Sequence, residues 1–89
     1  MLNLQINPNS GVPVYRQVAE QIRRYVDAGL LTPWEPLPSV AVLATSLTVN
    51  PATIIKAYGE LQHEDIVEMK VQKWGRVSFL VSRVAHFLC

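Results

Sequence analysis

The chain has 89 residues, of which 49% are hydrophobic and 17% are charged, and its formal net charge is +1. A chain of this length is expected to bury about 60 to 65% of the surface exposed in its unfolded state, so we predict one small domain with a single modest core. It contains no apolar run near the roughly 20 residues that cross a bilayer and no signal-peptide pattern, which together predict a cytoplasmic protein with no membrane partner.

The N-terminal residues Leu2, Leu4 and Ile6 alternate with polar residues, which is typical of a short strand. The turn-forming residues 7–11 follow them directly. We therefore expect a short strand at the periphery of the fold.

A first helix is predicted to begin at Pro13 and to close at Gly29. We expect its residues Arg23 and Arg24 to belong to a solvated face. The apolar positions of this helix follow a helical spacing, and they are Val14, Val18, Ile22, Tyr25 and Val26.

Residues 32–38 are predicted to form a loop. Three prolines fall within residues 33–38, and such a density excludes a helix. We expect Trp34, which lies in this loop, to cover the core.

Residues 38–61 predict two short helices joined by a tight turn, which is a helix-turn-helix. Ser39 precedes an apolar run and can cap the first helix, which is expected to end near Leu47. Asn50 can cap the second helix, and Pro51 occupies its first position, where a missing N–H costs nothing.

The second of these helices has a buried and an outer face. The buried stripe is formed by Ile54, Ala57, Tyr58 and Leu61, which leaves a small and barely charged outer face of Ala52, Ile55, Lys56 and Gly59. The N-terminal half carries one cation, no anion and the positive end of the helix dipole. In helix-turn-helix proteins this end meets DNA base edges.

A β-hairpin is predicted after the third helix, which we expect to end at Asp65. Residues 66–71 and 77–81 have the composition of two strands around a turn that contains Trp74-Gly75. Residues 65–89 hold four basic and two acidic side chains, so the positive excess of the chain lies in this region.

These segments together resemble the DNA-binding domain of the GntR family of bacterial transcription regulators, and in particular its YtrA-like branch. The resemblance covers roughly residues 11–68. Its motifs are Gly-Val-Pro-Val-Tyr-Arg-Gln-Val at 11–18, Gln-Ile-Arg-Arg at 21–24, Ala-Gly-Leu-Leu-Thr-Pro at 28–33, Leu-Pro-Ser-Val at 37–40, Val-Asn-Pro-Ala-Thr-Ile at 49–54 and Lys-Ala-Tyr-Gly-Glu-Leu at 56–61.

The resemblance implies a winged helix-turn-helix that binds palindromic operators as a homodimer. We predict a mainly α fold, with three helices and a two- or three-stranded antiparallel sheet, over residues 1–81. Residues 82–89 are predicted to form a short apolar tail, which is the remnant or the start of a dimerisation segment if the chain is a truncation, and belongs to a natural short form otherwise. If it is ordered, Val84, Phe87 and Leu88 are expected to cover the domain or to meet a second subunit.

The resemblance also implies a set of DNA-contacting residues, each with a plainer alternative. Ser39 and Asn50 are helix caps first, and Thr53 can bond within its own helical turn. Ile55 can touch a thymine methyl group or another protein. The basic residues of the set can contact phosphates or remain solvated. The full set is Ser39, Asn50, Pro51, Ala52, Thr53, Ile55, Lys56, Lys73, Gly75 and Arg76.

Three features depart from the family pattern, and they are two single positions and the wing. Ala41 stands where the family usually has an arginine that reaches DNA, and Trp34 stands where it prefers glycine. The wing needs about three extra residues to fit, and Val77 replaces its second glycine. Trp74, at the tip, can lie in a DNA groove or pack against protein.

The residues give little support to catalysis. The only cysteine is Cys89, so neither an internal disulfide nor a Cys-rich zinc site can form. His63 and His86 stand alone, and no Ser/His/Asp set, phosphate loop or metal-ligand spacing occurs. We expect no enzyme, no cofactor and no small-molecule effector.

The sequence therefore predicts a regulator that binds double-stranded DNA through the helix starting at Asn50 and a basic wing. The alternative hypothesis is a winged-helix interaction or dimerisation module that has lost specific DNA binding. Ala41, Ile55, the altered wing, the low net charge and the apolar tail favour that alternative.

Overall fold

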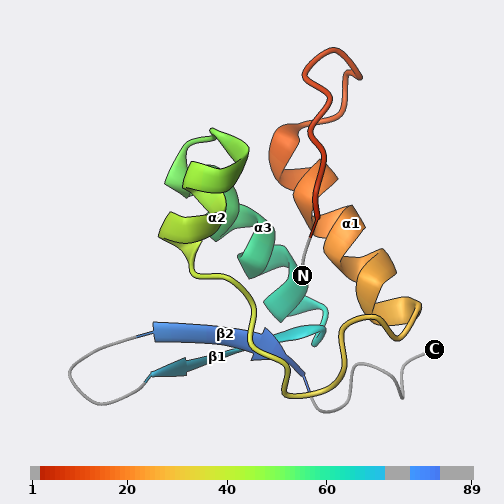
Figure 1. The fold of residues 1–89 in the computed structure, drawn as a ribbon, viewed down its shortest axis with the longest axis vertical. Helices are drawn as coiled ribbons and strands as arrows, with labels where there is room; N and C mark the ends of the chain where they lie inside the picture. Colours follow the sequence, from red (N-terminus) through yellow and green to blue (C-terminus); the bar gives the residue numbers. More distant parts are fainter. Residues whose placement is uncertain (1–2, 72–76, 83–89) are drawn as a thin grey trace.

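A computed structural model of the chain describes residues 3–71 and 77–82. Its elements in chain order are α1 (Val14–Asp27), α2 (Val40–Leu47), α3 (Pro51–His63), β1 (Val67–Val71) and β2 (Val77–Val81). The two strands pair antiparallel, with Met69 opposite Phe79, and the hairpin lies beneath the three helices (Figure 1). The predicted fold class of three helices and a small antiparallel sheet is confirmed.

The hydrophobic core lies between α1, α3 and the hairpin. The predicted buried stripe of α3 is confirmed, because Ile54, Ala57, Tyr58 and Leu61 are all fully buried. The side chains of α1 that join them in the core are Val18, Ala19, Ile22 and Val26. Val67 and Val81, which oppose each other in the hairpin, close this core from below.

Residues 34–37 bond to the edge of β2 that faces away from β1, so both edges of β2 are occupied. The N–H groups of Trp34 and Leu37 donate to the carbonyls of Val81 and Phe79, both at 2.8 Å. Pro36 forms an isolated antiparallel bridge with Leu80. The prolines thus exclude a helix, as predicted, and the segment uses its remaining N–H groups to hold the hairpin against the helices.

The prediction that Trp34 covers the core is wrong. Its residue surface is 50% exposed, and its backbone has a φ of 68°, in the left-handed region. The ring lies 5.5 Å from the Lys70 Nζ on the outer side of the hairpin. This positive φ gives a physical reason for the glycine that the GntR pattern prefers where this chain has Trp34, since glycine alone adopts such a φ without steric cost.

The predicted N-terminal strand is also wrong, because residues 3–10 form no strand in the structure. Leu4 is buried in the core, and side-chain amides from α1 replace a neighbouring strand. The Gln21 side chain accepts from the Gln5 N–H at 2.9 Å and donates to the Gln5 carbonyl at 2.7 Å. Gln17 makes the same pair of bonds with the backbone of Asn7.

Arg23 is not part of a solvated face, which corrects a further prediction, whereas Arg24 is exposed as expected. The Arg23 guanidinium makes two hydrogen bonds to Glu64 beyond the end of α3, at 2.6 and 3.1 Å, and one to Glu20 at 2.7 Å. Partial burial lowers the pKa of Arg23, but its bonds to the two carboxylates outweigh this effect and raise it. The ion pair joins α1 to the end of α3.

The end of α3 differs slightly from the prediction. The helix ends at His63, and Asp65 has a φ of 61° that turns the chain into β1. The first strand accordingly begins at Val67, one residue later than expected.

Tyr58 connects three elements of the fold. Its hydroxyl donates to the Pro38 carbonyl at 2.7 Å, and its ring lies 4.7 Å from the ring of Phe79 on β2. Burial raises the pKa of Tyr58 above its ordinary value, because the phenolate would lose its hydration.

Replacing Tyr58 with phenylalanine is expected to change how stability depends on pH. Because the folded state holds the phenol proton more tightly than the unfolded state, the stability due to this group is fully present below about pH 10 and is lost as pH rises further, by up to about 1.4 kcal/mol per pH unit. Urea denaturation between neutral pH and about pH 11 should show a steeper alkaline loss for the wild type. The variant should lose about 1 kcal/mol at neutral pH. Equal alkaline slopes would contradict the assignment.

A second prediction concerns Trp34. Glycine is normally about 0.5 to 1 kcal/mol less stabilising than alanine in ordered backbone, but at a positive φ the order reverses because alanine has a Cβ. We expect Trp34→Gly to be more stable than Trp34→Ala by about 1 kcal/mol, measured by thermal and urea unfolding. Both variants remove the indole, so their difference reports the backbone alone. A more stable alanine variant would contradict a left-handed backbone at residue 34.

Candidate nucleic-acid interface

The first helix of the predicted helix-turn-helix, α2, is capped at both ends as its sequence requires. The Ser39 hydroxyl accepts from the Val42 N–H at 3.2 Å. At the other end Thr48 has a φ of 56°, and the following N–H, that of Val49, donates to the Ala44 carbonyl at 3.0 Å. A left-handed residue at this position stops the helix and turns the chain toward α3.

The start of α3 also follows the prediction. The Asn50 side-chain oxygen accepts from the Ala52 N–H at 2.9 Å, and Pro51 occupies the first helical position. The first turn contains no acidic residue. The positive end of the helix dipole is therefore not neutralised by a side chain of its own turn.

The outer face of α3 is defined by Ala52, Ile55, Lys56 and Gly59, and all four are exposed as predicted. Ile55 is 58% exposed, which is unusual for a β-branched apolar residue on a helix surface. Ala52 and Gly59 add almost no side-chain bulk. A flat helix surface of this kind lets a large ligand approach the backbone closely.

Lys56 is not simply solvated. Its Nζ lies 4.2 Å from the centre of the Tyr15 ring on α1, which is a cation–π contact. The contact holds the ammonium group beside α3, in the seam with the first helix. Tyr15 was not predicted to be part of this surface, although it follows Val14 of the apolar stripe of α1 and so lies beside the buried face of that helix.

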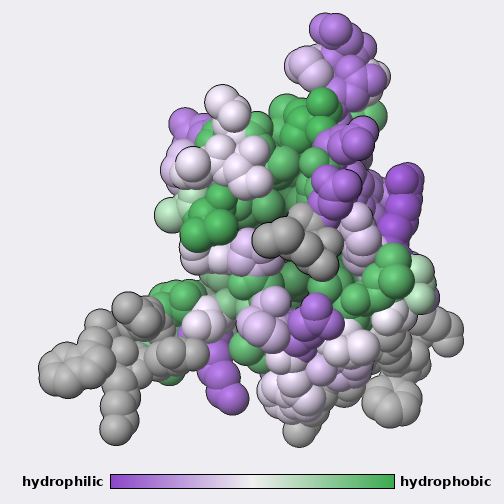
Figure 2. Space-filling model, in the orientation of Figure 1, coloured by the Kyte–Doolittle hydropathy of each residue, from purple (hydrophilic) through white to green (hydrophobic). Residues whose placement is uncertain are grey.

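The exposed side of α2 extends this surface. Ser39, Ala41 and Val42 are all exposed, and Val42 was not predicted to be so. Figure 2 shows apolar residues at the surface over α2 and between α2 and α1, beside the hydrophilic outer side of α1. The surface around the start of the two helices is therefore small and mostly uncharged.

Several predicted contact residues fall outside the described part of the chain. These are Lys73, Gly75 and Arg76 of the wing, together with Trp74 and the tail residues Val84, Phe87 and Leu88. The other predicted contacts lie together at the start of α2 and along the first two turns of α3, and all of them are exposed except the half-buried Thr53.

The described residues give no sign of another kind of site at this surface. Within residues 3–71 and 77–82, no cluster of three or more His, Cys, Asp or Glu side chains is arranged to hold a metal ion. None of the helices in these same ranges has the length and apolar character needed to cross a membrane.

Comparisons with known proteins agree with this geometry. A model of the family described as "Bacterial regulatory proteins, gntR family" matches residues 14–77. The transcriptional repressor YtrA of Bacillus subtilis (strain 168) is 43% identical over 65 residues, which cover 73% of this chain and 50% of YtrA. The chain therefore spans about half the length of that relative.

Two solved structures are similar in fold to this chain. YtrA from Sulfolobus acidocaldarius, a GntR-family transcription factor, has 37% identity and a TM-score of 0.76, with 89% of this chain and 79% of that chain covered. The DNA-binding domain of AraR in complex with operator ORE1 has 26% identity and a TM-score of 0.69, and 92% and 95% of the two chains are covered.

Proposed function

The chain belongs to the GntR family of bacterial regulatory proteins, and we propose that its winged helix-turn-helix binds double-stranded DNA with the outer face of α3 in the major groove. The observation that carries this proposal is the start of α3, where the positive helix end, the exposed Lys56 and the absence of acidic side chains in the first turn coincide. Binding would take place in the cytoplasm, on bacterial DNA.

The shape of α3 supports base contact. Because Ala52 and Gly59 have little or no side chain, the helix can approach the floor of a groove, and Ile55 projects between them. An exposed isoleucine can make an apolar contact with a thymine methyl group, which adenine, guanine and cytosine lack. Ile55 is thus the residue that we assign to direct sequence readout.

Phosphate contacts are assigned to the helix starts and to Lys56. Ser39 and Asn50 each accept one backbone N–H of their helix, the Thr53 N–H is bonded to the Asn50 carbonyl, and Pro51 has no N–H. At the start of α3 the attraction for phosphate is therefore assigned to the positive end of the helix dipole. Lys56 is held at the α1 seam by Tyr15 and can reach a phosphate from there. Thr53 and Pro51 complete the first turn, and Lys73, Gly75 and Arg76 of the wing are proposed to contact the backbone beside it.

Ala41 limits the specificity of this interface. The side chain is exposed at the start of α2, where an arginine could make a bidentate base contact worth roughly 1 to 3 kcal/mol. Alanine makes no such contact. Discrimination between sequences is therefore expected to come mainly from α3.

We further propose that two copies bind one palindromic operator, with half-sites about one helical turn apart. Residues 1–81 are assigned to the DNA-binding domain, and residues 82–89 to a segment that follows it. A homodimer would double the number of phosphate contacts, which matters for a chain with a net charge of only +1.

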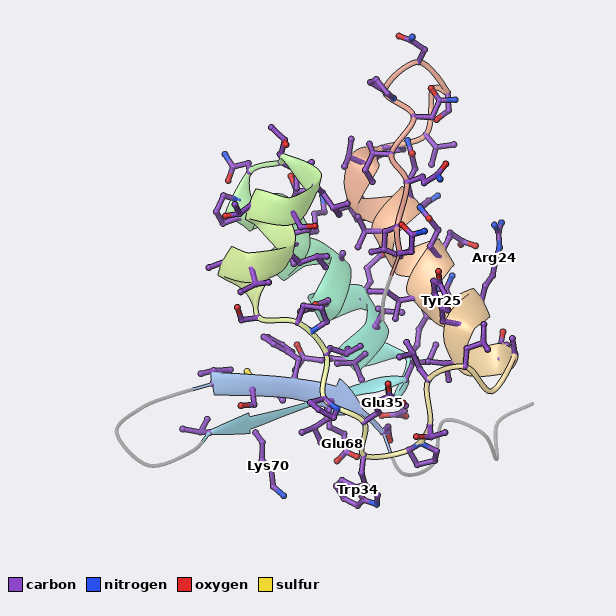
Figure 3. The ribbon with its side chains drawn as sticks, viewed as in Figure 1. Arg24, Tyr25, Trp34, Glu35, Glu68 and Lys70 are labelled. Carbon is purple, nitrogen blue, oxygen red and sulfur yellow. The ribbon has the colours of Figure 1, made fainter. Side chains whose placement is uncertain are left out.

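The function is tested by removing one charge at two positions. Lys56→Gln lies on the proposed interface, whereas Arg24→Gln removes an equal charge from an exposed arginine on α1 (Figure 3). Fluorescence anisotropy of random-sequence duplex DNA should show a log–log salt slope about 0.9 smaller for Lys56→Gln, because one phosphate contact is lost. The slope for Arg24→Gln should match the wild type.

Two results would contradict the proposal. Equal slopes for the two variants would exclude Lys56 from the DNA contact. An absence of binding at low salt, from a protein shown by circular dichroism to be folded, would exclude DNA binding by this domain altogether.

A further inference from the structure

β1 pairs with β2 along one edge, and no residue of the described ranges 3–71 and 77–82 pairs with its other, open edge. In an antiparallel ladder, alternate residues point their N–H and C=O groups to opposite sides. The Ser82 N–H donates to the Ile66 carbonyl, so Ile66 and the alternate residues Glu68 and Lys70 direct their backbone groups toward β2. The backbone groups of Met69 and Val71 must therefore point away from β2.

The other side of β2 is already occupied. Val81 accepts from the Trp34 N–H and donates to the Glu35 carbonyl, so residues 34–37 fill that edge. Within the described ranges, the sheet contains β1 and β2 only, and no segment pairs with the outer edge of β1. Figure 1 shows this strand at the open side of the hairpin.

The open edge is also apolar on one face. Met69 is 50% exposed and Val71 is 65% exposed, and both point to the same face as the buried Val67. An exposed strand edge with apolar side chains is a template for pairing with another strand.

From this edge we infer that a second copy of the chain pairs with the first through β1, antiparallel and with Met69 on the two-fold axis. The charges on β1 are the reason to expect a second copy of the same strand as the partner of this edge. In this register Glu68 lies opposite Lys70 of the partner subunit, and the pair occurs twice by symmetry. Moving the axis to Glu68 or to Lys70 would place two like charges opposite each other, which is destabilising.

The contact that Lys70 makes within its own copy is compatible with its pairing across the two copies. Lys70 lies over the Trp34 ring at 5.5 Å, and Figure 3 shows both side chains on the side of the hairpin away from the helices. Glu68 is on the same face of β1, because the two residues are two apart in the strand. The charged pairs therefore form on the outer face, and the apolar pairs on the helix-facing side.

The same register also places apolar side chains of the two copies opposite each other. Val71 lies opposite Val67 of the partner subunit, and the two Met69 side chains meet on the axis. Because this axis is perpendicular to the sheet, the helices of both copies lie on the same side of one continuous sheet. The inference deepens the proposed homodimer by naming its surface, and it does not depend on the DNA contacts.

The test is a charge exchange between two copies of the full chain, measured by sedimentation equilibrium without DNA. Glu68→Lys and Lys70→Glu each place like charges opposite each other in the homodimer, so each variant alone should dimerise at least about fivefold more weakly than the wild type. An equimolar mixture of the two variants should restore dimerisation, because both cross-strand pairs in the mixed dimer are again of opposite charge. No contact within one copy can produce that rescue.

A second variant and a second measurement guard against misfolding of the charge variants. Met69→Pro removes an N–H that points away from β2, so it should keep the hairpin and abolish dimerisation. In wild-type protein, amide exchange at Met69 and Val71 should slow as concentration rises, whereas that of Lys70, already directed to β2, should not change.

Three outcomes would overturn the inference. They are a wild type that stays monomeric up to millimolar concentration, single variants that dimerise as well as the wild type, and a mixture no heavier than its components. None of them bears on DNA binding, which the Lys56 and Arg24 variants measure separately.

Discussion

The hydrogen bond from Tyr58 to the Pro38 carbonyl fixes the geometry on which the candidate interface depends. Tyr58 lies on the buried side of α3, Pro38 immediately precedes the cap of α2, and Phe79 on β2 packs against the Tyr58 ring. One side chain therefore sets the positions of both helices of the helix-turn-helix and of the hairpin relative to each other. A buried phenol is suited to this, because its hydroxyl must find a partner and its ring fills the space between the layers.

The helix-turn-helix could be predicted from the sequence because its signals are local. Ser39, Asn50 and Pro51 act within one helical turn, and the stripe of Ile54, Tyr58 and Leu61 follows from the helical period alone. The wrong predictions, for Trp34 and Arg23, concern residues whose bonding partners lie far away in the sequence. The Trp34 N–H bonds to Val81 on the last strand, and Arg23 finds its partner Glu64 41 residues further along the chain. Neither bond can be predicted from the spacing of residues along the chain.

The N-terminal segment shows why a correct local pattern can give a wrong element. Alternating apolar residues predict an extended backbone with one buried side, and Leu4 is indeed buried. A strand also needs a neighbouring strand, and here the amides of Gln17 and Gln21 supply those bonds from a helix. Periodicity reports which side of a segment is buried, but not what satisfies its backbone.

The charge distribution decides more than the net charge in this protein. A total of +1 predicts little attraction to DNA, yet the first turn of α3 has no acid and Lys56 is held at its edge by Tyr15. On β1 the same reasoning applies at a finer scale, since Glu68 and Lys70 cancel in the sum but alternate along an open strand. Two cancelling charges at alternate positions favour one antiparallel register of a second copy and disfavour its neighbours. A net charge near zero is thus compatible with both the proposed DNA surface and the proposed self-association surface.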